Sequence, residues 1–178
     1  MKIAVASDIH GSLCALCAFL KQAEALGAEK ILLLGDLYYH GVRNPLPEEY
    51  KPFEVASVLN KIADKLIVVR GNCDSDVDQT VSDFTMASEA VLFLDGKTVH
   101  ASHGDRFDAE NLPVGRYDVV LYGHYHTAFI KKVGDTVVAN PGSPSLPKGG
   151  TRPAFLLLDE KTITLYSLEG EVLQSQRI

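Results

Sequence analysis

Two histidines, His124 and His126, follow an apolar run at residues 119–122 within the segment VVLYGHYH. The β-branched, apolar run predicts a buried strand, and residues two apart in an extended chain point to the same side. If the strand continues, both imidazole rings face one spot, which is a geometry that binds metal ions. A histidine pair alone is more often a hydrogen-bonded, solvated feature, so the rest of the chain has to decide.

Polar residues of metal-binding types also follow other predicted strands, at residues 2–7, 30–35, 66–70 and 97–102. The C-terminal ends of parallel strands lie along one edge of a sheet, where ligands bind in α/β proteins. Each fragment alone is weak evidence, but their agreement along the chain makes coincidence the poorer explanation. We therefore expect one site with seven candidate ligands and with Asp74 beside them. The candidate ligands are Asp8, His10, Asp36, Asn72, His103, His124 and His126.

The mixture of nitrogen and oxygen ligands indicates which ions such a site would bind. It suits Mn²⁺, Fe²⁺, Zn²⁺ or Ni²⁺ better than Ca²⁺ or Mg²⁺, and we expect Mn²⁺ first. Seven candidate ligands exceed what one tetrahedral ion uses, so two ions about 3.5–4 Å apart are the simpler interpretation. One carboxylate should then bridge the two ions.

The elements that must position these residues alternate between strand and helix in the first half of the chain. One helix is predicted over residues 12–26, with Ser12 as its N-cap and Gly27 as its stop. A second is predicted over residues 52–64 and opens with Pro52. Together with the strands they form a βαβαβ pattern, whose strands we expect to be parallel and buried.

The second half of the chain instead predicts strands joined by tight turns. Hairpin signals occur at Asp95-Gly96, Gly134-Asp135 and Glu169-Gly170. Two more apolar strands are predicted at residues 154–159 and 162–168. We therefore expect two sheets packed face to face with helices outside, in a single domain spanning residues 1–178.

Composition limits the class of function. A net charge of -6 and a pI near 5.5 argue against a broad nucleic-acid-binding surface, but they allow a small phosphorylated substrate. The N-terminal apolar run is too short for a signal peptide, and no run approaches a membrane span. The three cysteines suit a reducing compartment, so we expect a cytoplasmic protein.

Two of the cysteines, Cys14 and Cys17, form a C-x-x-C pair inside the first predicted helix. The apolar residues around them repeat at helical spacing, so we assign the pair to core packing.

The ordered motifs DIH, GD, GN, HG, GHYH and NPGS, spread over residues 8–143, resemble those of the calcineurin-like metallophosphoesterase superfamily. Three longer stretches, HGVRNPLPEEYKP, RGNCDSDVDQ and NPGSPSLPKGG, resemble the small bacterial YfcE-type phosphodiesterases in particular. The resemblance implies a four-layer αββα sandwich of two mixed β-sheets flanked by helices. This agrees with the strands and helices predicted from the residues.

The resemblance also implies how the ligands divide between two ions. One ion would take Asp8, His10, Asp36 and His126. The other would take Asp36, Asn72, His103 and His124, so that Asp36 bridges. Of these residues, we count Asp36, Asn72 and His103 as catalytic.

Cys73 departs from the superfamily pattern, which commonly has histidine after the motif asparagine. That histidine is credited with stabilising the transition state or protonating the leaving group. A thiol is a poorer acid for this purpose and carries no positive charge. We therefore expect substrates with good leaving groups, and we read Cys73 as a small residue beside the substrate rather than as a catalytic thiol.

Other residues receive more limited interpretations. His40 and Arg43 follow the bridging Asp36 and either contact a phosphate or lie on a solvated loop. We interpret Asp74 as a residue that is not itself a metal ligand but orients one of the ligands. His100 is interpreted as a structural histidine. The NPGS segment at residues 140–143 is expected to close the floor of the pocket.

The function predicted from these residues is hydrolysis of a phosphoester, most simply a phosphodiester. A hydroxide bridging the two ions would attack phosphorus in line, and the ions would take up the developing charge. The alternative is a protein-interaction scaffold, since a related retromer subunit shares this fold and has lost part of the ligand set. The complete ligand set favours the enzyme. The sequence leaves the physiological substrate, the native metal and homo-oligomer formation open.

Overall fold

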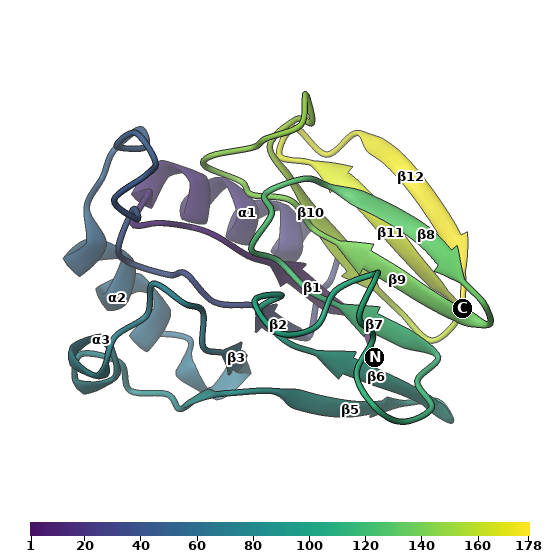
Figure 1. Cartoon of the computed structure of the whole chain (residues 1–178). Helices are drawn as coiled ribbons and strands as arrows, with labels where there is room; N and C mark the ends of the chain where they lie inside the picture. The colour runs from purple at the N-terminus through teal and green to yellow at the C-terminus, as the bar shows by residue number, and fades with distance from the viewer.

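A computed structural model describes residues 1–178, and its strands form two sheets (Figure 1). The seven-stranded sheet has the order β12-β11-β10-β1-β2-β3-β4, and the five-stranded sheet has the order β5-β6-β7-β9-β8. The strands of the larger sheet are β1 (Ile3–Ala6), β2 (Lys30–Leu33), β3 (Leu66–Val69), β4 (Met86–Ala87), β10 (Ala154–Leu158), β11 (Thr162–Ser167) and β12 (Val172–Arg177). Those of the smaller sheet are β5 (Ala90–Leu94), β6 (Lys97–Ala101), β7 (Val119–Leu121), β8 (Phe129–Val133) and β9 (Thr136–Asn140).

The predicted parallel core is confirmed. β1 pairs with β2, β2 with β3 and β3 with β4, all in parallel. Every residue of β1 is buried, because one face of the larger sheet packs on helices and the other on the smaller sheet. This two-sided burial explains why these strands are apolar throughout and do not alternate.

Two helices cover the outer face of the larger sheet. In α1 (Leu13–Ala25) the side chain of Ser12 caps the N-terminus by accepting a bond from the backbone N–H of Ala15. Gly27 follows the helix with a φ of 73°, as its predicted role as a stop requires. The core assignment of the C-x-x-C pair is wrong, because Cys17 is exposed and Cys14 only partly buried. The buried stripe runs instead through Ala15, Leu16, Phe19 and Ala23.

The second helix, α2 (Pro52–Asn60), opens at Pro52 as predicted but ends before residue 64. The chain then tightens into a short 3-10 helix, η1 (Ala63–Lys65), before entering β3. At the end of α2, Nδ2 of Asn60 donates to the backbone oxygen of Val81, and Oδ1 of Asn60 accepts from the backbone N–H of Asp83. These bonds hold the helix end against residues 81–83. A further short helix, α3 (Asp76–Thr80), lies beyond β3. None of the helices has the length and hydrophobicity that a membrane span requires.

The hairpins predicted for the second half are present. β5 and β6 pair antiparallel around Asp95-Gly96, and β8 and β9 around Gly134-Asp135. β11 and β12 pair around the turn that contains Glu169-Gly170. The segment 105–118 covers the outer face of the smaller sheet without forming a helix, and it packs Leu112 and Tyr117 against the sheet.

Two apolar clusters hold these layers together. One lies between the sheets and includes Val5, Leu34, Val99, Leu121 and Leu156. The other lies between the larger sheet and the helices and includes Leu16, Phe19 and Phe155. Because both faces of β1 to β3 are fixed in this way, the residues that follow these strands have defined positions at one edge of the sandwich.

Candidate metal centre

The structure brings all seven predicted metal ligands together at this edge. They follow the C-terminal ends of strands from both sheets, which meet there face to face. Asp8 and His10 follow β1, Asp36 follows β2, Asn72 follows β3, His103 follows β6, and His124 and His126 follow β7. The site therefore lies at the joint between the two sheets, and neither sheet could form it alone.

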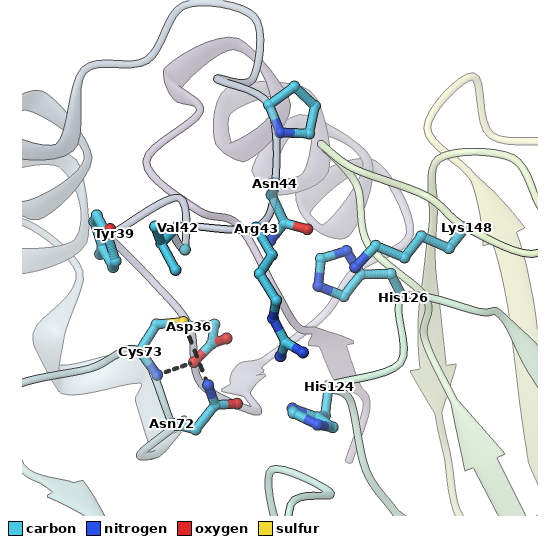
Figure 2. Close-up of a pocket in the computed structure, with 12 residues that line it drawn as sticks. Asp36, Tyr39, Val42, Arg43, Asn44, Asn72, Cys73, His124, His126 and Lys148 are labelled. Atoms are coloured by element: carbon cyan, nitrogen blue, oxygen red, sulfur yellow. Dashed lines mark hydrogen bonds between the residues drawn. The ribbon is translucent and has the colours of Figure 1, made fainter.

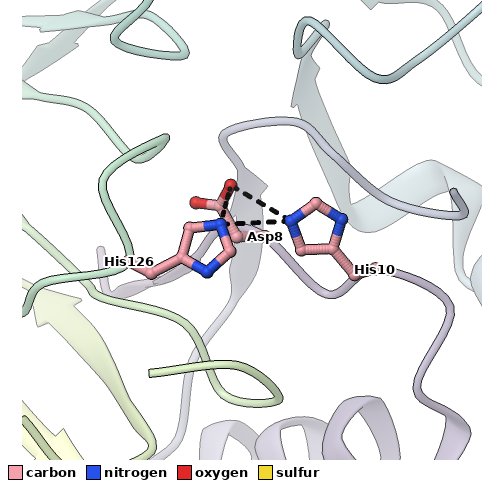
Figure 3. A group of neighbouring side chains, drawn as sticks. All are labelled: Asp8, His10 and His126. Carbon is pink, nitrogen blue, oxygen red and sulfur yellow. Dashed lines mark hydrogen bonds and ion pairs between the residues drawn. The ribbon is translucent and has the colours of Figure 1, made fainter. Parts of the chain in front are cut away.

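One half of the site consists of Asp8, His10 and His126, all of them buried (Figure 3). The Nε2 atoms of His10 and His126 lie 3.1 Å apart. Oδ1 of Asp8 lies 3.3 Å from Nε2 of His126 and 3.7 Å from Nε2 of His10. Three potential ligand atoms from distant parts of the chain thus face one small volume.

The other half of the site is built around His103. Its Nε2 lies 2.9 Å from Oδ1 of Asn72 and 3.2 Å from Nδ1 of His124. Asp36 lies between the two halves, with Oδ1 3.5 Å from Nε2 of His103 and Oδ2 3.8 Å from Nε2 of His10. A carboxylate with one oxygen toward each half has the placement that a bridging ligand needs.

The hydrogen bonds of the histidine rings test whether this site suits a cation. Nδ1 of His10 lies 2.6 Å from the carbonyl oxygen of Tyr39, and Nδ1 of His126 and His103 lie 2.7 Å from carbonyl oxygens of Leu146 and Leu34. A carbonyl only accepts, so each Nδ1 carries the proton and each Nε2 of a neutral ring carries a lone pair. These lone pairs face one another and the oxygens of Asp8, Asp36 and Asn72, and the donor set therefore fits a cation.

Two further observations agree with this fit. Oδ1 of Asp8 is buried and has no hydrogen-bond partner, a condition that costs free energy unless a cation satisfies it. Burial opposes protonation of His103, but the negative charges of Asp36 and Asp8 outweigh it and raise the pKa of His103. The same charges attract a metal ion.

The backbone around the ligands is unusual. Seven residues other than glycine have a positive φ, and five of them are candidate ligands. They are Asp8, His10, Asp36, His124 and His126, with φ between 50° and 65°. Left-handed backbone is uncommon for residues with a side chain and concentrates at functional sites. The sharp turns it produces carry each side chain from its strand end into the site.

This backbone corrects the geometry expected for His124 and His126. β7 ends at Leu121, so the two residues do not alternate along an extended strand. Each instead occupies its own left-handed turn, and the rings join different halves of the site. Gly123 allows this because a side chain there would collide with Ser7 and Asp8.

Asp74 holds two of the loops in place. Its carboxylate accepts bonds of 2.8 Å from the backbone N–H groups of Asp36, Leu37 and Gly71. It thereby joins the turn after β2 to the turn after β3. Asp74 contacts the backbone of a candidate ligand rather than its side chain, and burial raises the pKa of its carboxyl group.

The NPGS segment fixes two of the turns that carry candidate ligands. The hydroxyl of Ser143 donates to the backbone oxygen of Asp8 at 2.7 Å, and Nδ2 of Asn140 donates to that of Gly123 at 2.7 Å. Both side chains are buried and fix the turns that carry Asp8 and His124.

His100 is buried away from the cavity, as expected of a structural histidine. Its Nε2 lies 2.9 Å from the carboxylate of Glu89.

A cavity of about 690 Å³ opens over the candidate ligands (Figure 2). Arg43 and Cys73 line it, as does Lys148, for which the sequence analysis gave no role. His40 does not line it and packs instead against the rings of Tyr39 and Tyr50. The only sequence signal for Lys148 is its place in the stretch that follows NPGS.

Cys73 lies at the edge of the second half of the site. Its backbone N–H donates to Oδ1 of Asp36 at 2.8 Å, and its Sγ lies 3.4 Å from Nδ2 of Asn72. Burial and the charge of Asp36 raise the pKa of the thiol to about 12. A thiol in this environment stays protonated at neutral pH and is a poor proton donor.

Comparisons with known proteins agree with this geometry. Residues 1–162 match the model of the calcineurin-like phosphoesterase superfamily domain. The chain is 40% identical over 178 residues to the phosphodiesterase YfcE of Escherichia coli K12, a match that covers 99% of this chain and 97% of that protein. The solved structure of YfcE, a phosphoesterase from E. coli, superimposes with a TM-score of 0.96 at 39% identity and covers all of both chains.

More distant structures share only the fold. An archaeal phosphodiesterase has a TM-score of 0.67 at 19% identity, with all of both chains covered. Vps29 of Entamoeba histolytica in complex with Zn²⁺ has a TM-score of 0.65 at 22% identity, covering 100% of this chain and 98% of that one.

Proposed function

Because the chain belongs to the calcineurin-like phosphoesterase superfamily, we propose that it is a metal-dependent phosphodiesterase that works with two divalent ions. The observation that carries the proposal is the placement of Asp36, which presents one carboxylate oxygen to each half of the site. The full-length similarity to a protein named a phosphodiesterase supports the reaction class. We treat residues 1–178 as a single catalytic domain.

The residues divide between two ions as follows. Asp8, His10, Asp36 and His126 would hold the first ion, and Asp36, Asn72, His103 and His124 would hold the second. When bound, such ions acidify the attacking water and take up the charge that develops on the phosphoryl oxygens. Mn²⁺ is our proposed native metal, with Ni²⁺, Fe²⁺ and Zn²⁺ as the other ions that suit these ligands.

The protein's own residues orient the reactants. The carbonyl groups of Tyr39, Leu34 and Leu146 fix the histidine rings with Nε2 toward the site. This preorganisation stabilises charge in the transition state without rearrangement. Asp36, Asn72 and His103 lie at the centre of the arrangement, and we assign the catalytic role to them.

Two residues that line the cavity bear on which substrate it accepts. Arg43 extends over the ligands between Asn72 and His124 (Figure 2), where its guanidinium group can bind phosphoryl oxygens in a bidentate manner. Cys73 lies beside the leaving group and supplies no proton to it. The substrate is therefore a small phosphodiester with a leaving group that departs without protonation.

The scaffold alternative receives less support. The similarity to Vps29 structures is about 20% in sequence and extends to the fold, whereas all seven ligand residues converge in this chain. Three free cysteines support placing the enzyme in the reducing cytoplasm.

The direct test is reconstitution of the metal-depleted protein with single ions. We expect two ions per chain at saturating Mn²⁺ by elemental analysis, and hydrolysis of bis(p-nitrophenyl) phosphate that returns with the metal. A stoichiometry that stays at one or below contradicts the two-ion assignment. Stoichiometric loading without hydrolysis of any phosphoester in a substrate panel favours the scaffold.

A further inference from the structure

Two cationic side chains, Arg43 and Lys148, line the cavity, and neither has an ionic partner. Neither makes a side-chain hydrogen bond or an ion pair in the structure, although carboxylates outnumber cations in the chain, 23 to 17. Of the 17 Lys and Arg side chains of the chain, four form ion pairs, namely Lys51, Arg70, Lys97 and Arg152. Arg43 and Lys148 differ from the other unpaired cations because both line the same cavity. Two unneutralised cations in one cavity of an acidic protein indicate a binding site for anions.

The two cations enter the cavity from different loops. Arg43 lies in the segment after β2, where the side chain of Asn44 bonds the backbone oxygen of His40 at 2.9 Å. Lys148 is attached to the opposite wall. Its backbone N–H donates to the oxygen of His126 at 2.9 Å, and its own oxygen accepts from the hydroxyl of Thr151 at 2.8 Å. Figure 2 shows Arg43 extending toward Asn72 and His124, and Lys148 entering from the side of His126.

The charges in the site exceed what a simple phosphodiester can balance. This step rests on the proposed function. The carboxylates of Asp8 and Asp36 neutralise about half of the charge of two divalent ions, and Arg43 adds a further positive charge beside them. A simple diester brings one negative charge, on the scissile phosphate, and deprotonation of the attacking water adds one more. Lys148 remains without a counter-charge from either the protein or that phosphate.

We propose that Lys148 is a specificity residue that binds a second anionic group on the organic part of the substrate. The preferred substrates are then phosphodiesters that carry an additional phosphate or carboxylate. Both groups suit an ammonium ion, which is a compact charge with three freely rotating donors and does not require a planar partner.

The shape and lining of the cavity agree with a substrate of this kind. Its volume of about 690 Å³ falls within the range of roughly 300–1,000 Å³ typical of sites for small organic ligands. Asn44 and Lys148 make the outer wall polar, and the exposed side chains of Tyr39 and Val42 offer limited apolar surface. The site therefore suits a polar molecule considerably larger than phosphate.

The test uses two p-nitrophenyl phosphodiesters whose second alcohol is 2-carboxyethyl or the isosteric 2-carbamoylethyl. They differ by one negative charge far from phosphorus. With the Mn²⁺-loaded enzyme we expect the carboxylate ester to have a KM lower by about fivefold, the upper end of what one exposed ion pair contributes. Lys148→Met should abolish this preference, Lys148→Glu should reverse it, and kcat for the amide should stay within about twofold.

The matched control is Lys132→Met, which removes an exposed lysine of β8 outside the cavity lining and should leave both KM values unchanged. A third ester with a terminal phosphate decides which anion fits better. Equal KM values for carboxylate and amide in the native enzyme overturn the proposal. The proposal is also overturned if Lys148→Met changes the KM values of the carboxylate and amide esters by the same factor.

Binding separates this proposal from the proposed reaction. The phenylphosphonate monoesters of the same two alcohols keep the charge on phosphorus and replace the aryloxy leaving group with a P–C bond that is not hydrolysed. The one ester bond left has a poor alkoxide leaving group, so these compounds serve as binding probes. We expect calorimetry with the Mn²⁺-loaded protein to give tighter binding of the carboxylate, lost in Lys148→Met. If this holds while no diester is hydrolysed, the reaction assignment fails and the anion site stands. If hydrolysis proceeds but binding shows no preference, the reaction stands and the role of Lys148 fails.

Discussion

At the scale of single residues, the ring nitrogens of three histidines decide what the site can hold. His10, His103 and His126 each donate through Nδ1 to a backbone oxygen, so Nε2 is left as a base pointing inward. Burial lowers the pKa of His10 despite the attraction of Asp8 and Asp36 for a proton. The ring of His10 therefore stays neutral, and available to a metal, at a pH somewhat below the ordinary pKa of histidine.

The first prediction concerns the bridging carboxylate. Asp36→Asn keeps the shape of the side chain but removes its charge and one acceptor oxygen, so it should abolish hydrolysis with little loss of fold. His124→Ala should do nearly as much damage. We expect activity assays and far-UV circular dichroism on both variants to show this separation. Activity within about tenfold of the native enzyme, a barrier change of only about 1.4 kcal/mol, contradicts the assignment.

The second prediction concerns Cys73. Its thiol is held protonated by burial and by Asp36, so the native enzyme should hydrolyse aryl phosphodiesters far better than alkyl ones. Cys73→His should accelerate poor leaving groups selectively, because a general acid contributes typically 10²- to 10⁴-fold where protonation limits the rate. Cys73→Ser should change little.

A plot of log rate against leaving-group pKa for the three proteins measures both effects. A large loss in Cys73→Ser at unchanged metal content shows that the thiol itself takes part.

At the scale of elements, the site depends on the turns that follow the strands. Strand pairing sets where each turn begins, but the turns are held by side chains from other segments. Asp74 ties the turns after β2 and β3 together through three backbone bonds, and Ser143 reaches the backbone of Asp8 from residues far along the chain. The ligands are thus positioned by connections between elements rather than by any one element.

The third prediction tests this connection. Asp74→Ala leaves the buried N–H groups of Asp36, Leu37 and Gly71 without an acceptor. Each unsatisfied buried group costs about 1–3 kcal/mol, so the free energy of unfolding should fall by at least about 2 kcal/mol, and metal affinity should fall with it. Urea denaturation and metal titration measure the two effects.

Asp76→Ala is the matched control for this measurement. The side chain of Asp76 is 96% exposed and pairs with Arg70 at the surface, so its loss should be within about 0.5 kcal/mol. Equal effects of the two substitutions would show that the carboxylate of Asp74 does not hold the turns.

At the scale of the whole molecule, the site lies where the two sheets meet. Asp8, Asp36 and Asn72 come from the larger sheet, and His103, His124 and His126 come from the smaller one. Metal ions bound to both sets of ligands would therefore link the sheets. Binding to the folded protein and not to the unfolded chain stabilises the fold by mass action.

The fourth prediction follows from this linkage. Each proposed site that is filled by Mn²⁺ at about 100 times its dissociation constant should add about 2.7 kcal/mol to the free energy of unfolding. In a chain of this size that corresponds to a rise in Tm of roughly 5–10 °C. Differential scanning calorimetry with and without Mn²⁺ measures it, and excess chelator should reverse it. Asp36→Asn should show a much smaller rise, and a full rise in that variant would place the stabilising metal elsewhere.

The parallel core, the hairpins and the set of seven candidate ligands could be predicted from the amino-acid sequence, because these features depend on local patterns. Apolar runs specify buried strands, turn residues specify hairpins, and strand ends collect along one edge. The resemblance to the calcineurin-like superfamily, to which the chain belongs, added the proposed division of the candidate ligands between two ions.

The orientation of the candidate ligands, and the other side chains that reach them, depend on the tertiary structure. The tautomers of His10, His103 and His126 depend on carbonyl oxygens 20 to 69 residues away in the sequence. The left-handed turns at His124 and His126, the exposure of Cys17 and the place of Lys148 in the cavity likewise depend on packing between distant segments. No local pattern encodes such contacts, because they exist only after both sheets have formed and closed on each other.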